Sequence, residues 1–155
     1  ADNIYVKIPI INSTGISSSY VIKELNKLNI KINITAVLTK EQIKIAFDSL
    51  VNKDIPSIIS IFCGRISDTG INCKEYITYA KKLTIKYPNI KILWASVREI
   101  YNIIEAIECN CDIITLPNSI YDKLDYLDKN LEDFSIETSL QFYNDGIKSN
   151  IKILE

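Results

Sequence analysis

The stretch Ile4-Tyr-Val-Lys-Ile-Pro-Ile-Ile11 is the first of five short apolar runs from which the fold class can be inferred. Similar runs, rich in β-branched residues, occupy residues 32–38, 57–63, 90–95 and 111–116. Runs of this length and composition are typical of buried parallel strands. The sequence therefore predicts a parallel sheet that begins close to residue 4.

Longer segments with helical spacing of apolar residues lie after these runs, at residues 17–28, 40–51, 73–87, 97–109 and 138–148. Regular alternation of strand and helix indicates an α/β fold, and a chain of 155 residues suits one domain, 1–155. Two architectures compete, an open doubly wound sheet and a closed barrel. A dinucleotide-binding open sheet would need a glycine-rich turn after the first strand, but residues 12–15 contain only Gly15.

Composition excludes several classes of function. Lysine and arginine number 18 and aspartate and glutamate 19, scattered along the chain, so we expect no nucleic-acid partner. We also expect no membrane partner and a cytoplasmic location, since no apolar stretch approaches about 20 residues and no secretory signal is visible. Histidine is absent, which removes histidine-assisted nucleophiles and histidine-bound metals. We expect no metal and no cofactor, although Cys109-Asn-Cys111 leaves a redox or metal pair open.

Polar residues inside the apolar runs favour the barrel. In a barrel strand alternate residues point inward, and the active site lies at the carboxyl ends of the strands. Each residue also has a simpler explanation, since Lys7 could be a solvated edge residue, Ser96 a helix cap, and Arg65 and Arg98 ordinary surface charges. Their joint placement is harder to explain in that way. We expect these residues on one inward face: Lys7 with Tyr5 and Pro9, Asn33 with Thr35, Ser60 with Phe62, and Trp94 with Ser96.

The same residues carry a family resemblance that runs from about residue 4 to the end. In order and spacing, five motifs resemble those of transaldolases and the related fructose 6-phosphate aldolases. They are Val6-Lys-Ile-Pro9, Asn33-Ile-Thr-Ala-Val37, Ser60-Ile-Phe-Cys-Gly-Arg-Ile66, Trp94-Ala-Ser-Val-Arg98 and Cys111-Asp-Ile-Ile-Thr115. The resemblance implies a TIM (β/α)8 barrel, of which this chain supplies about the last five βα units.

The resemblance also implies roles for individual residues. Lys7 would form a covalent imine, for which its amine must be neutral, and we expect a low-dielectric barrel interior to favour that form. Thr35 matches the threonine that positions a catalytic water, while Asn33 and Ser60 match residues that bind donor hydroxyls or the imine. The substrate phosphate would be bound by Arg65, Ser96 and Arg98, consistent with bidentate guanidinium–phosphate hydrogen bonds.

One position separates the two branches of the family. The aldolases place a tyrosine where this chain has Phe62, and they tend to have lysine in place of Arg98. The implied reaction is therefore transfer of a dihydroxyacetone unit from sedoheptulose 7-phosphate or fructose 6-phosphate to an aldose phosphate, in the pentose phosphate pathway. Fructose 6-phosphate cleavage, or sugar-phosphate binding without catalysis, remain alternatives. Asp68 and Cys63 lie beside the motifs, and we expect structural roles for them.

Members of the family place several further strand–helix units before the strand that carries the lysine. With those units lie an aspartate that handles the proton of carbon–carbon cleavage and a group that orders the water. General acid–base groups contribute about 10²- to 10⁴-fold each, so we expect these 155 residues alone to be catalytically crippled. Sugar phosphates are the expected small-molecule partners. A second copy of the chain, or a complementing N-terminal barrel segment, is the expected protein partner.

Overall fold

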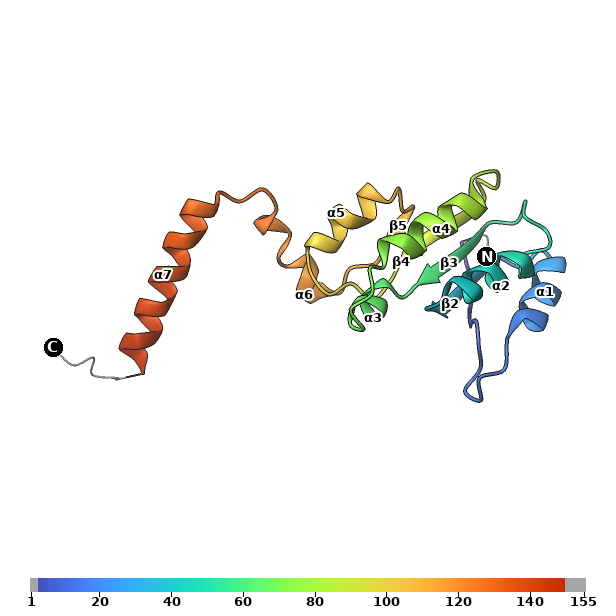
Figure 1. Cartoon of the computed structure of the whole chain (residues 1–155), viewed down its shortest axis with the longest axis horizontal. Helices are drawn as coiled ribbons and strands as arrows, with labels where there is room; N and C mark the ends of the chain where they lie inside the picture. Colours follow the sequence, from blue (N-terminus) through green and yellow to red (C-terminus); the bar gives the residue numbers. More distant parts are fainter. Residues whose placement is uncertain (1–2, 150–155) are drawn as a thin grey trace. The chain divides into compact units, whose positions relative to one another are not determined.

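The computed structural model describes residues 3–149, which form two compact units. The first reaches to Tyr121 and the second begins at Asp122. Figure 1 shows the elements of both units in chain order. The first unit holds every strand and every residue predicted to form a site.

Strands and helices alternate through the first unit, as predicted. The strands are β1 (Val6–Pro9), β2 (Ile32–Val37), β3 (Ser57–Ile61), β4 (Ile90–Trp94) and β5 (Ile113–Ile114). The helices are α1 (Ser19–Lys27), α2 (Lys40–Ser49), α3 (Cys63–Ser67), α4 (Lys74–Thr84), α5 (Tyr101–Glu108) and α6 (Asn118–Tyr121). The strand predicted over residues 57–63 ends at Ile61, because helix α3 begins directly after it.

The five strands form one parallel sheet in the order β1-β2-β3-β4-β5. A doubly wound sheet reverses its strand order at a switch point, whereas consecutive strands of a barrel pair in sequence. Helix α1 contacts α2, and α2 contacts α4, so these helices form one layer on the sheet. An α/β fold of five sequential parallel strands with such a layer is consistent with part of a TIM barrel.

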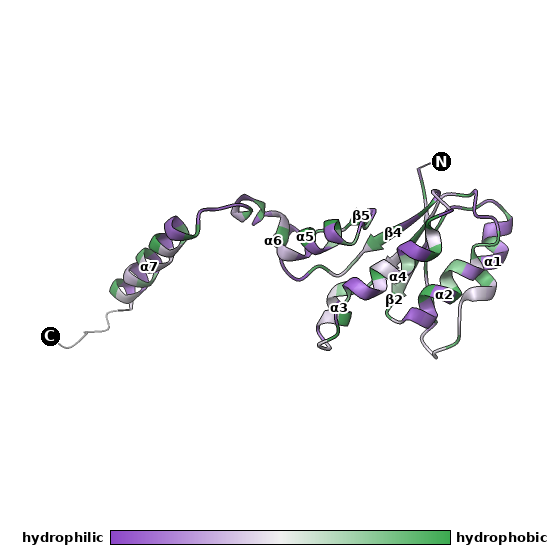
Figure 2. Ribbon diagram, turned by 45° about the horizontal axis from the view of Figure 1, so that its top comes forward, coloured by the Kyte–Doolittle hydropathy of each residue, from purple (hydrophilic) through white to green (hydrophobic). Residues whose placement is uncertain are grey.

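The hydrophobic core lies between this helical layer and one face of the sheet. Alternate strand residues such as Ile34, Ile59 and Ile92 are fully buried there against helix residues such as Ile43 and Ile77. Figure 2 shows hydrophobic and hydrophilic bands alternating along the helices, as expected for helices that bury one side. The opposite face of the sheet carries Lys7 and its neighbours, so the face predicted to hold the site is separate from the core.

An irregularity lies at the end of β2, next to one of the predicted site residues. The register with β3 shifts between Ile34 and Val37, and both of these residues are fully buried in the core. Thr35 and Ala36 stand between them, with Ala36 in the left-handed backbone region at φ 57°. Thr35 shares the Lys7 face with Asn33 by ordinary alternation, and the extra residue acts as a bulge that returns Val37 to the core.

The second unit contains a short 3-10 helix η1 (Leu124–Tyr126) and helix α7 (Leu131–Lys148). The predicted helix at 138–148 thus begins earlier, at Leu131, where the Asn130 side chain accepts hydrogen bonds from the amides of Glu132 and Asp133. No residue of α7 is buried. Among the residues described, no helix combines the length and the apolar character that crossing a bilayer would require.

Candidate active site

A hollow of about 330 Å³ at the carboxyl ends of the strands collects most of the predicted site residues. We call it the Lys7 pocket. β1 contributes Lys7, and the other groups come from β2, from β3 and the α3 turn, from β4, and from the segments that follow β4 and β5. Its lining residues are Lys7, Asn33, Ser60, Phe62, Arg65, Leu93, Ala95, Ser96 and Thr115.

Lys7 lies beside Asn33 in the strand register, at the open side of the pocket. Its side chain is exposed on β1, an edge strand of the sheet, whereas Ser60 and Leu93 on the same face are buried. The low-dielectric interior that we expected around the lysine is therefore not supplied by these residues. Lys7 in this chain is more exposed to solvent than we expected.

The Ser60 hydroxyl donates a hydrogen bond of 2.6 Å to Oδ1 of Asn33. Ser60 is only 2% exposed, so the contact is held firmly at the floor of the pocket. Since Oδ1 of Asn33 accepts this hydrogen bond, the orientation of its amide group is fixed. The N–H donors of that group make no hydrogen bond to the described residues and can face a ligand. A pair of this kind suits hydroxyl or carbonyl oxygens of a small polar substrate.

Thr35 does not line the Lys7 pocket, and it pairs with Pro9 in the strand register. It is 8% exposed, and its hydroxyl oxygen is buried without a hydrogen-bond partner among the described residues. Buried polar atoms in folded proteins nearly always have a partner, whether protein, ligand or ordered water. An unpartnered hydroxyl on the lysine-bearing face is what a water-positioning threonine would present.

A close backbone approach builds the other end of the pocket. A Cβ atom on Gly64 would lie 1.6 Å from the carbonyl oxygen of Ser96, so only glycine permits the α3 turn to pack on this loop. Ser96 itself is in the left-handed region at φ 65°. This packing brings Arg65, on the α3 turn, and Ser96 into one pocket, as predicted for a phosphate site.

Arg98 faces a neighbouring hollow of about 340 Å³, which shares Ser96 and Thr115 with the Lys7 pocket. Its guanidinium binds Asp68, with Nε 3.2 and 3.1 Å from the two carboxylate oxygens and Nη2 2.5 Å from Oδ2. This hydrogen bonding holds the pKa of Asp68 below its usual range and raises that of Arg98. Arg98 is thus near the predicted phosphate position but already engaged with a carboxylate.

One predicted orientation is wrong. Trp94 was expected on the inward face with Ser96, but its side chain is fully buried in the core on the helix-covered face. Ser60 pairs with Leu93 in the register, and Leu93 and Ala95 line the pocket instead. The prediction assumed that strand alternation continues to Ser96, which would put Trp94 on the same face. Ser96 instead lies beyond the end of β4 in a left-handed conformation, where alternation no longer holds. The strand pairing places Leu93 opposite Ser60, so Leu93 is the β4 residue on the site face.

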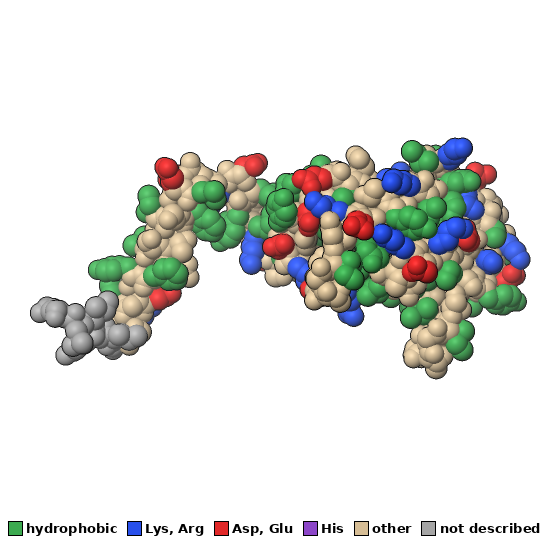
Figure 3. Space-filling model, in the orientation of Figure 1, with side chains coloured by type: hydrophobic (Ala, Val, Ile, Leu, Met, Phe, Trp, Pro, Cys, Tyr) green, Lys and Arg blue, Asp and Glu red, His purple; other side chains and the backbone are tan. Residues whose placement is uncertain are grey.

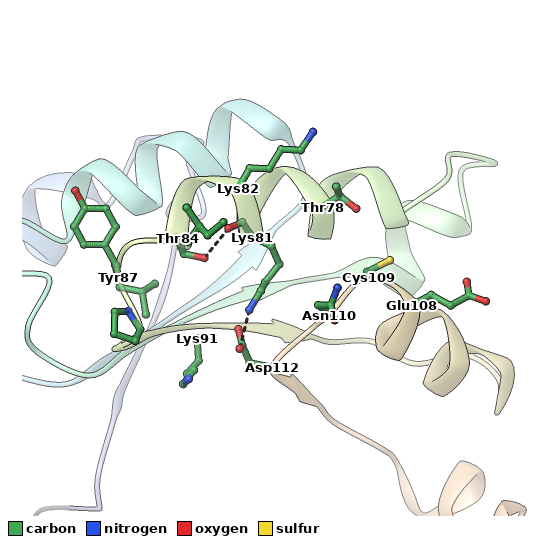
Figure 4. Close-up of a pocket in the computed structure, with 13 residues that line it drawn as sticks. Thr78, Lys81, Lys82, Thr84, Tyr87, Lys91, Glu108, Cys109, Asn110 and Asp112 are labelled. Atoms are coloured by element: carbon green, nitrogen blue, oxygen red, sulfur yellow. Dashed lines mark hydrogen bonds and ion pairs between the residues drawn. The ribbon is translucent and has the colours of Figure 1, made fainter.

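A larger hollow of about 480 Å³ lies at the opposite, amino ends of the strands, between α4 and the α5–β5 connection. Lys81 there donates to Asp112 at 2.8 Å, and the other Asp112 oxygen accepts from the Ile92 amide at 2.8 Å. Figure 4 shows Lys82 and Lys91 extending away from this pair in opposite directions. The charged groups of this hollow do not converge on a ligand position, so the Lys7 pocket is the better candidate site.

The four cysteines are free, and Cys63 and Cys73 are buried. Burial raises the pKa of Cys63, and it raises the pKa of Cys111 to about 11. Within residues 3–149 no three or more cysteine, aspartate or glutamate side chains are grouped as metal ligands. On the face of the first unit drawn in Figure 3, basic and acidic side chains are interspersed without a stripe of one sign.

Comparison with known proteins shows which family this chain is similar to. Residues 1–151 match the family model described as transaldolase/fructose-6-phosphate aldolase. Similar curated proteins include probable transaldolases of Nitrosopumilus maritimus, 32% identical over 125 residues, Caldicellulosiruptor saccharolyticus, 31% over 151, and Brucella ovis, 33% over 138. These alignments cover 79%, 96% and 86% of this chain but 52%, 64% and 59% of the relatives.

The chain therefore spans about half to two thirds of the length of these relatives. The match covers the segment from β1 to α7, which includes every residue of the Lys7 pocket. The chain belongs to the transaldolase/fructose-6-phosphate aldolase family.

Proposed function

We propose that this chain carries the Schiff-base half of a transaldolase-type active site, with Lys7 as the residue that forms an imine with a ketose phosphate. The observation that carries the proposal is the Lys7 pocket, which gathers an amine, a hydrogen-bonded amide–hydroxyl pair and a guanidinium from separate strands and turns. A lysine amine can attack a ketone and create an electron sink for carbon–carbon cleavage.

The other residues take distinct roles in this proposal. Asn33 and Ser60 bind hydroxyls of the donor or of the imine. The unpartnered Thr35 hydroxyl holds the water that is released when the imine forms and that later hydrolyses it. Arg65, Ser96 and Arg98 bind the substrate phosphate. The Phe62 ring has no hydroxyl with which to hold a second water, which favours transfer of a dihydroxyacetone unit to an aldose phosphate over simple cleavage.

The complete reaction belongs to a complete (β/α)8 barrel in this proposal. The five strands described leave Lys7 exposed on the edge strand β1, and further βα units would cover it. Those units would also supply the acid–base carboxylate, and they come either from a longer chain or from a second polypeptide. Covering the face would remove water from Lys7, which favours the neutral amine. We place the activity in cytoplasmic sugar metabolism, in the pentose phosphate pathway.

Product analysis with fructose 6-phosphate tests the proposed reaction. We expect an aldose phosphate acceptor to receive the three-carbon unit, at a low rate with this chain alone. Release of free dihydroxyacetone without transfer would support the aldolase alternative instead.

The exposure of Lys7 favours one further candidate, a sugar-phosphate-binding fragment without catalysis. In that case Lys7→Ala would leave both phosphate binding and every other interaction with the sugar unchanged. The enzyme proposal expects phosphate binding to be largely retained in Lys7→Ala while covalent capture of the donor is lost.

A further inference from the structure

The contact between Asp68 and Arg98 joins the segment after α3 to the loop after β4, and both lie next to the proposed phosphate site. Asp68 caps the carboxyl end of helix α3, and Arg98 lies in the loop after β4. The carboxylate accepts hydrogen bonds from both Nε and Nη2 of the guanidinium, at 2.5 to 3.2 Å. This side-on geometry is the specific, two-pronged form of the arginine–carboxylate pair.

Two further contacts fix the rest of Arg98. Its backbone amide donates to Oδ1 of the buried Asn102 at 3.0 Å. Its Cγ would lie 3.1 Å from a Cβ placed on Gly64, so the aliphatic stem packs over that glycine. Nε and Nη2 are used by Asp68, whereas Nη1 makes no hydrogen bond to any residue within 3–149. One corner of a positioned guanidinium is therefore available to a ligand.

The hollow next to Arg98 places that corner near the proposed phosphate. Ser96 and Thr115 line both this hollow and the Lys7 pocket, so they mark the boundary between the two. Arg65 approaches the boundary from the Lys7 pocket and Arg98 from the other hollow. A phosphate at Ser96 would lie between two guanidinium groups, of which Asp68 hydrogen-bonds that of Arg98.

We infer that Asp68 is the positioning residue of the phosphate subsite, because it holds the Arg98 guanidinium in place and leaves one edge for the ligand. The inference rests on the proposed function. An arginine side chain that must be ordered on binding weakens affinity by about two- to tenfold. Arg98 and Asp68 are each half exposed, so this ordering is not supplied by burial. The hydrogen bonds from Arg98 to Asp68 order the guanidinium before a ligand binds.

Positioning and simple electrostatics predict opposite signs for the variant Asp68→Asn. Removing a negative charge beside an anion site would tighten phosphate binding if charge alone mattered. Exposed charges are screened, with a Debye length of about 8 Å at 0.15 M salt, so this gain is small. Loss of the ordered guanidinium is larger, and we expect the variant to bind phosphate about three- to tenfold more weakly.

The test is a titration of the chain with inorganic phosphate and with fructose 6-phosphate, followed by the NMR amide signals of Ser96 and Thr115. Asp68→Asn is compared with wild type, Arg98→Ala, Asp68→Glu and Asp48→Asn. Asp48 is the matched control, since it forms a similarly exposed ion pair with Lys44 far from the site. The Arg98 Nε–H signal, recorded without ligand, reports directly whether the guanidinium is ordered.

We expect Asp68→Asn to weaken the binding of both ligands and to broaden or average the Arg98 Nε–H signal. Asp48→Asn should bind both ligands as wild type does, and Asp68→Glu should bind them more tightly than Asp68→Asn but less tightly than wild type. If wild type binds phosphate and Arg98→Ala reduces that binding, but Asp68→Asn binds as well as wild type or better, the inference alone is overturned. If wild type binds neither ligand, the proposed phosphate site fails, and the role of Asp68 fails with it.

Discussion

At the scale of single residues, Gly64 determines whether the phosphate end of the pocket can form. The Ser96 carbonyl occupies the space where any other residue would carry its Cβ, at 1.6 Å from the ideal position. Both partners are backbone atoms or bound to the backbone, so neither can rotate away as a flexible side chain would. The close approach is what brings Arg65 and Ser96 into one hollow.

We therefore predict that Gly64→Ala lowers the free energy of unfolding by about 1–3 kcal/mol, the usual range for overpacking a well-packed site. Chemical denaturation followed by circular dichroism measures this change. Gly146→Ala is the control, because its Cβ would meet nothing within 4 Å in helix α7. A stability of Gly64→Ala equal to that of wild type would show that the α3 turn and the Ser96 loop do not pack as described.

The Cys73 thiol, at the start of α4, is expected to titrate near neutral pH. Its hydrogen bond with the Cys63 thiol lowers the pKa of Cys73 to about 7, from an ordinary value of 9.0. A folded-state pKa below the unfolded value favours the thiolate. This group therefore contributes stability that is fully present above about pH 9 and is lost as the pH falls through about 7.

The prediction is checked by the thiolate absorbance at 240 nm across a pH titration of the folded chain. We expect a step with a midpoint of about 7 that disappears in Cys73→Ser and moves to higher pH in Cys63→Ala. A first thiolate step near pH 9 in the wild-type chain would be inconsistent with the Cys63–Cys73 contact.

At the scale of elements, helix α2 shows how local sequence sets the frame of the site. The Thr39 hydroxyl accepts from the Gln42 amide at 3.0 Å, and Gln42 Oε1 accepts from the Thr39 amide at 3.2 Å. Gln42 Oε1 also accepts from the Leu38 amide at 2.8 Å, just past the end of β2. This reciprocal capping begins the helix immediately after the strand that carries Asn33 and Thr35.

Thr39→Ala should accordingly destabilise the chain by about 1 kcal/mol, the typical effect of losing a helix cap. Ser18→Ala is the matched control, since Ser18 precedes α1 without a side-chain capping bond. Urea denaturation of the two variants beside wild type gives the comparison. Equal losses in both variants would mean that the capping bonds of Thr39 contribute nothing specific.

Element existence was largely predictable, and element boundaries were not. The β-branched runs predicted all five strands, because buried parallel strands require continuous apolar residues. Helix α3 was not predicted, since Cys63-Gly-Arg-Ile-Ser67 is too short to show helical spacing and continues an apolar strand. β5 extends over only Ile113–Ile114 of the predicted 111–116 run, and beside it the Asp112 side chain, rather than a backbone carbonyl, accepts from the Ile92 amide.

At the scale of the whole molecule, the site residues were predictable as a group because parallel strands bring their carboxyl ends to one edge. What the sequence could not predict is contact between side chains far apart in the chain. The Asp68–Arg98 pair joins residues on two separate loops, and the Ser60–Asn33 bond depends on the register of two strands. The wrong orientation of Trp94 has the same origin, since it depends on a backbone turn at Ser96 that no pattern indicated.

The arrangement of charge around the site is also a property of the whole sheet. The core lies on the helix-covered face, while the other face, with Lys7 exposed, presents polar groups of Asn33, Ser60 and Arg65. A sheet stabilised from one side in this way can place polar groups on the other without losing its core. This separation explains how a lysine can lie within an apolar strand and remain accessible to a substrate.

The most direct test of the central claim is to mix the chain with fructose 6-phosphate, reduce with borohydride, and locate any adduct by intact and peptide mass analysis. We expect a donor-derived adduct on Lys7 that is absent from Lys7→Ala and retained in Lys91→Ala, which removes another exposed strand lysine. Folded wild-type protein with Lys7 unmodified, or with label spread over other lysines, would contradict it.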